Sequence, residues 1–178
     1  MSVEQMTRNL NHGVLIFRDG GGSAMKTLVI PVEVGNLKWT QTTDSKRINH
    51  RKDLLPFAEG RDVPMEVSFT IGFVNYMADP SDSSTESPMD VLDHTANAAD
   101  WQSVEDWGVF AIDLEFRIRS PNPDIDKHEI LVFENFHKTK ADIEEDEDFD
   151  KIAVSGMCRA TRPTSTRLTD AQWNALTY

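Results

Sequence analysis

The acidic run at residues 142–150 is the segment whose composition most directly suggests chemistry, because carboxylate oxygens are preferred ligands of Ca²⁺. An EF-hand that starts at Asp146 needs Gly at its sixth position and Glu at its twelfth, where the sequence has Lys151 and Met157. The spacing therefore excludes an EF-hand. It favours a solvated connection between strands, with a loose cation site or a surface that repels another polyanion as the alternatives.

The common catalytic and phosphate-binding motifs do not occur in the sequence. His128-Glu129 is followed by Val132, where a zinc protease helix needs its second histidine. The glycines at 20–22 are not followed by the Lys and Ser or Thr of a phosphate-binding loop, so they indicate a hairpin turn. We therefore assign no catalytic, cofactor-binding or metal-ligating residue, and we expect a protein that is not an enzyme.

The charge balance limits the partners that the chain can bind. Its 178 residues include 18 Lys and Arg against 30 Asp and Glu, which gives a net charge of −12. Because neutralising phosphates requires cations, this balance disfavours tight binding of nucleic acid. The length predicts one domain over residues 1–178, and the single Cys158 excludes an intramolecular disulfide. No apolar run approaches the roughly 18 residues of a membrane span, so we expect no membrane contact.

Alternation of apolar and polar residues predicts strands along most of the chain. It is clearest in 65–73, where Met65, Val67 and Phe69 alternate with polar residues, and in 110–118. The other predicted strands are 14–17, 28–34, 37–42, 130–136 and 152–160. In 130–136 the alternation breaks, as it does in a bulged or doubly buried strand.

Two short helices are predicted. Ser87 can cap a helix near 88–100 that begins with Pro88, and Thr169 with Gln172 has the spacing of a capping box. Many strands without an alternating strand–helix order indicate a mainly β fold. We predict an antiparallel β-sandwich or barrel with one flanking helix, a long inter-strand loop and a short C-terminal helix. Its expected parts include an N-terminal arm and hairpin (1–24), the long loop (43–63) and a C-terminal arm (163–178).

The predicted loop at 43–63 is basic and partly apolar, although the protein as a whole is acidic. Loops of this length in a compact domain are usually functional or disordered. The composition therefore predicts docking on another, acidic copy, with a solvated hairpin tip as the alternative. The candidate contact residues are Lys46, Arg47, His50, Arg51, Lys52, Leu54, Leu55, Phe57 and Arg61.

The order of features from about residue 25 to residue 162 resembles the tail tube (major tail) proteins of long-tailed bacteriophages and gene transfer agents. The resemblance is carried by Gly-Asn-Leu-Lys-Trp-Thr at 35–40, Glu-Gly-Arg-Asp-Val-Pro at 59–64 and Met-Glu-Val-Ser-Phe-Thr at 65–70. A helix, a long amphipathic strand and two closing strands around an acidic loop then follow in the same order.

This resemblance implies a structural protein of the virion tail that is assembled in the cytoplasm of the bacterial host. Six copies would form a ring, and stacked rings would form a tube through which DNA passes without specific binding. The tape measure and tail terminator would be further partners. The loop at 43–63 is where members of this family contact neighbouring subunits and rings.

A tube wall that carries carboxylates would not trap DNA, because it has the same charge sign as the phosphates. We expect Glu66, Asp113 and Glu115 to line the lumen. Two alternatives remain open. One is a non-polymerising β-sandwich module for tail completion, capsid decoration or carbohydrate binding, and the other is an enzyme in which Asp113 and Glu115 act as acid and base.

Overall fold

The computed structural model describes residues 13–22, 25–30, 37–49, 54–72, 77–79, 81–82, 85–104, 108–119, 128–144 and 151–176, and it describes only the backbone of residues 44–49, 54–62 and 96. Within these residues, one eight-stranded antiparallel sheet has the order β2-β1-β7-β8-β9-β6-β3, with β10 paired to β8. Its strands are β1 (Gly13–Arg18), β2 (Thr27–Ile30), β3 (Lys38–Thr40), β6 (Met65–Gly72), β7 (Ile112–Ile118), β8 (His128–Glu144), β9 (Lys151–Cys158) and β10 (Thr164–Leu168). The mainly β, antiparallel fold is confirmed.

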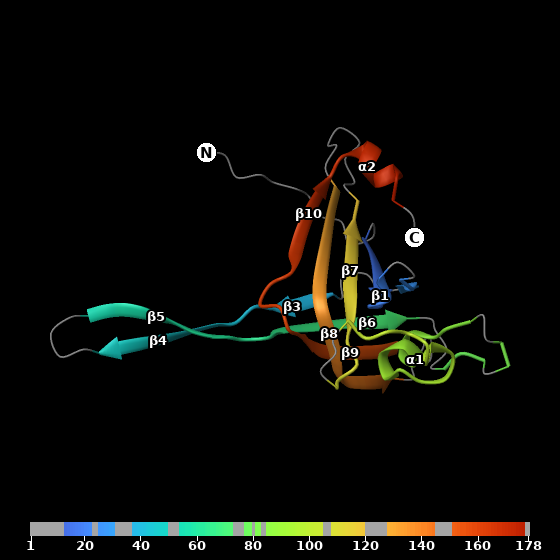
Figure 1. The fold of residues 1–178 in the computed structure, drawn as a ribbon, viewed down its shortest axis with the longest axis horizontal. Coiled ribbons are helices and arrows are strands. Elements are labelled where there is room, and N and C mark those ends of the chain that lie inside the picture. Colours follow the sequence, from blue (N-terminus) through green and yellow to red (C-terminus); the bar gives the residue numbers. More distant parts are fainter. Residues whose placement is uncertain are drawn as a thin grey trace.

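The large sheet folds over its own core because β8 changes partners along its length. Its first half pairs with β7 and β10, and its second half pairs with β9. Figure 1 shows β7 and β10 running across the direction of β6 and β9, so the strands form two layers. Phe17 of β1 and Phe69 of β6 meet edge to face between these layers, with their ring centroids 5.9 Å apart.

A β-bulge lies where β8 changes partners. Two residues of β8, Glu134 and Asn135, stand opposite the single residue Asp113 of β7. Asn135 has a φ of 56°, a conformation that Asn adopts more readily than most residues. Its backbone N–H donates to Asp113 Oδ1 at 2.9 Å, so the amide freed by the bulge has a partner. The break in alternation at residues 131–133 predicted a bulged or doubly buried strand; pairing there is regular, and the bulge lies just after it, at residues 134 and 135.

The buried faces of the strands follow the alternation of the sequence. In β6 the side chains of Met65, Val67 and Phe69 are buried, whereas Glu66 between them is exposed. Trp39 and Phe133 add a second edge-to-face contact at 5.5 Å. The core also contains Leu15, Phe17, Ile30, Ile71, Met89, Val91, Trp101, Ile112, Leu114, Phe116, Leu131, Phe136, Ile152, Val154 and Cys158.

Helix α1 (Pro88–Asp93) begins as predicted and ends earlier. The Ser87 side chain accepts from the backbone N–H groups of the first turn, and Pro88 occupies the first helical position. The helix ends at His94, whose φ of 53° is left-handed, and a 3-10 helix, η3 (Ala96–Ala98), follows. The predicted helix near 88–100 is therefore divided into two short segments.

The predicted C-terminal arm contains β10 and α2 (Asp170–Asn174). Thr169 and Gln172 form the predicted capping box, in which each side chain bonds to the other residue's backbone. His128 of β8 hydrogen-bonds Asp170 at 2.5 Å and its ring contacts Trp173. Strand β10 was not predicted, because its mostly exposed side chains leave no apolar alternation in the sequence.

The region predicted as a long loop is instead a β-ribbon. Strands β4 (Thr43–Asn49) and β5 (Leu54–Asp62) pair with each other in an antiparallel register that contains two irregularities. The sequence of this strand pair has no regular alternation of apolar and polar residues, so a search for alternation does not find it. β8 also runs well past its predicted end at residue 136, so it includes the first part of the acidic run. Residues 145–150 lie outside the described residues.

Candidate assembly interface

The β4–β5 ribbon extends away from the rest of the protein. In the described residues it forms a separate two-stranded sheet and pairs with no strand of the large sheet. Figure 1 shows it projecting on the side opposite α1. An isolated two-stranded ribbon is only marginally stable in water, so such a ribbon needs a surface to pack on.

Six of the nine predicted contact residues lie in the strands of this ribbon. Lys46 and Arg47 belong to β4, and Leu54, Leu55, Phe57 and Arg61 belong to β5. His50, Arg51 and Lys52 lie outside the described residues. The structure thus places the six on one projecting element, and contact with another copy stays a prediction.

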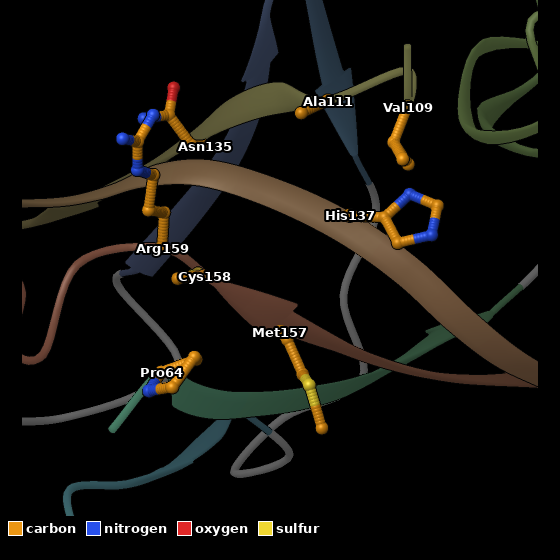
Figure 2. A pocket seen from close by; sticks show the side chains of 8 residues that line it. All are labelled: Pro64, Val109, Ala111, Asn135, His137, Met157, Cys158 and Arg159. Atoms are coloured by element: carbon orange, nitrogen blue, oxygen red, sulfur yellow. The ribbon is translucent and has the colours of Figure 1, made fainter. Parts of the chain in front are cut away.

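A mainly apolar groove of about 440 Å³ lies near the root of the ribbon. Figure 2 shows the side chains that line it, with Val109 beside His137 and with Asn135 beside Arg159. Val109 is 50% exposed and Met157 is 46% exposed, although both are apolar. The other lining residues are Pro64, Ala111 and Cys158.

Hydrogen bonds to backbone groups hold the chain at Gln102 and at Ala111, which lines the groove. The Gly20 N–H donates to the Gln102 carbonyl at 2.8 Å, and the Gln102 N–H donates to the carboxylate of Asp19 at 3.2 Å. The Ala111 N–H donates to Ser103 Oγ at 3.1 Å. The groove is therefore built on anchored backbone. No sequence pattern marks the groove, because its residues come from four separate segments of the chain.

Cys158 is the thiol in the wall of this groove, and its side chain is fully buried. Burial, together with the nearby carboxylate of Asp113, raises the pKa of the Cys158 thiol to about 12. At pH 8 the thiolate should therefore be about a thousandfold scarcer than for a thiol with the ordinary value. We expect no reaction with Ellman's reagent in the folded protein and one thiol per chain after unfolding in urea. Rapid labelling of the folded protein would contradict this.

The open face of β3, β6, β9 and the second half of β8 is polar. Cross-strand partners share a face, and the register places Glu66 opposite Met157 and Lys140 opposite Ser155. A shallow groove of about 340 Å³ runs over this face. Its charged residues in the described strands are Lys38, Lys140 and Lys151 against Glu66, Asp142 and Glu144. The described face is thus balanced in charge and not acidic.

The three predicted lumen residues differ in exposure. Glu66 is exposed on the open face. Asp113 is partly buried beside the bulge, and burial raises its pKa against the opposing effect of the Asn135 N–H bond. Glu115 is only 2% exposed and is paired with Arg18 and with Arg117, whose Nε lies 2.5 Å from Glu115 Oε1. Its carboxylate therefore does not reach a surface of the single subunit.

The burial of Glu115 gives a test that separates it from Glu66. Glu115→Lys would place a third cation beside Arg18 and Arg117, so we expect it to lower the free energy of unfolding by about 4 kcal/mol. Glu66→Lys, at an exposed position, should change it by less than about 0.5 kcal/mol. Urea unfolding of both variants measures the difference. Equal stability of the two would contradict the buried ion pairs.

Two further features bear on function. Within the described residues, no three His, Cys, Asp or Glu side chains are grouped so that they could hold a metal ion. No helix in that part of the chain is long and apolar enough to cross a membrane.

No protein-family model matches the sequence, and no curated protein matches it either. The fold does match a chain in "Cryo-EM structure of the anti-feeding prophage (AFP) baseplate, 6-fold symmetrised". The TM-score is 0.50 at 8% sequence identity, and the match covers 93% of this chain and 97% of that chain. The likeness is one of fold.

Proposed function

We propose that this protein is a structural subunit of a phage tail or a related particle, and that its copies form the stacked six-membered rings of a tail tube. The observation that carries the proposal is the fold likeness to a chain of a six-fold symmetrised baseplate, which extends over nearly all of both chains. In this role the protein is not an enzyme. Its place is the virion tail, assembled in the cytoplasm of the bacterial host.

The projecting ribbon supports assembly into larger particles. A ribbon that leaves the body of its own subunit can pack on a second subunit, and the same contact can be repeated by every copy. Growth by such a contact has no built-in end point. The length of the tube is therefore set by other tail proteins, such as a tape measure and a terminator.

The lumen would be lined by the open polar face that carries Glu66, with Asp113 near its margin. This face has as many acidic as basic residues among those described. A wall without excess cations releases few counterions from DNA, so DNA passes without being held. Changing Glu66 to Lys should then slow DNA ejection while leaving tube assembly intact.

Negative-stain microscopy of the purified full-length protein over a range of concentrations tests the proposal. Stacked rings or tubes are the expected result. A uniform small particle at every concentration would instead favour a non-polymerising accessory module. In a separate assay, sugar-dependent activity would favour an enzyme.

A further inference from the structure

The distal half of the ribbon contains apolar residues in both strands. Ile48 and Leu55 are cross-strand partners, so they lie on one face of the ribbon. Phe57 follows in the same strand. Among the described residues, the ribbon pairs with no strand of the large sheet.

The apolar groove beside Val109 cannot receive the tip of its own ribbon. Pro64, which lines the groove, follows the end of β5 by two residues, so the groove lies at the ribbon's root. The nine residues of β5 carry the tip about 30 Å from this root. Figure 1 shows the ribbon pointing away from the body. The tip can therefore meet such a groove only on another copy.

We infer that the groove around Val109 and Met157 is the receiving site for the distal ribbon of a second copy, with Leu55 placed near Val109. This inference rests on the proposed function, and it names the surface that the ribbon contacts. The contact is head-to-tail, because ribbon and groove are different surfaces of the same subunit. Each copy that docks presents a new ribbon and a new groove, so the contact repeats along the assembly.

Charge supports a second copy as the occupant. The sequence from residue 45 to residue 57 contains four basic residues and one acidic residue, Asp53. The rest of the chain holds 14 of the 18 basic residues and 29 of the 30 acidic ones. A basic tip is therefore drawn toward the acidic body of another copy, while the apolar contact fixes where it docks.

Disulfide trapping between two populations of subunits tests the inference. One population carries Leu55→Cys and the other carries Val109→Cys, and the native Cys158 stays in place because its thiol is fully buried. The matched control replaces Val109→Cys by Met77→Cys, because Met77 is 53% exposed and lies outside the groove. Met157→Cys serves as a second probe of the groove. Mild copper-phenanthroline oxidation is followed by non-reducing gel electrophoresis.

We expect cross-linked dimers from Leu55→Cys mixed with Val109→Cys or Met157→Cys, at least tenfold more than with Met77→Cys. A chain that carries both Leu55→Cys and Val109→Cys should give a ladder of multimers. If the wild-type protein forms rings or tubes but the groove probes cross-link no better than the control, the inference is overturned and the proposed function stands. If neither particles nor cross-links form, both are overturned.

Discussion

Deleting the ribbon is expected to leave a folded subunit that no longer assembles. Thr43 and Asp62 are partners at the ribbon's root, so the chain can be cut after Asp44 and resumed at Arg61 through an Asn-Gly turn. The ribbon forms a sheet of its own among the described residues, so the free energy of unfolding should change by less than about 1 kcal/mol. Microscopy should show no rings or tubes, and urea unfolding checks that the body is intact.

The shortened subunit also provides its own control, because it keeps the apolar groove. When it is added in small amounts to wild-type protein, its groove should bind the ribbon of a wild-type copy. Because it has no ribbon, it cannot bind the groove of a further copy. We therefore expect shorter assemblies as its share rises. Tubes of normal length from the shortened subunit alone would show that the ribbon does not drive assembly.

Gly156→Ala is expected to destabilise the subunit more than any exposed substitution. A Cβ atom at Gly156 would lie 2.3 Å from the His137 carbonyl oxygen and 2.5 Å from ring carbons of Phe136. Phe136 is buried in the core, so neither neighbour can move away without disturbing the β8–β9 pairing. Overpacking of this kind should cost roughly 3 kcal/mol, which corresponds to a fall in Tm of about 10 °C.

Gly72→Ala in the neighbouring strand is the matched control. A Cβ atom at Gly72 meets nothing within 4 Å, and its backbone is not left-handed. We expect its stability to stay the same or to rise by a few tenths of a kcal/mol, since Ala restricts the unfolded chain more than Gly does. Thermal unfolding of the two variants side by side measures the contrast. Similar Tm values would mean that β8 and β9 are not as close at Gly156 as the structure shows.

The core strands could be predicted from the sequence because one face of each is buried. Met65 and Phe69 of β6 are apolar because they are buried, so apolar and polar residues alternate in the sequence of this strand. The second half of β8 could not be predicted in this way. Residues such as Lys140 and Asp142 are exposed, and pairing with β9 rather than burial makes them a strand.

The candidate interface was only partly predictable. The charge of Lys46 and Arg47 and the apolar residues of β5 drew attention to the region that forms the ribbon. The strands of the ribbon could not be predicted, because apolar and polar residues do not alternate regularly in their sequence. The groove could not be predicted from the sequence, because Pro64, Val109 and Met157 come together only through the pairing of distant strands.

Cryo-electron microscopy of the assembled wild-type protein, viewed end on, tests the proposed function most directly. Six identical subunits around an open channel, each contacting its neighbours through its ribbon, are the result that we predict. A ring of another symmetry, a filled centre, or only single particles of 20.1 kDa would contradict the proposal of a six-fold tube.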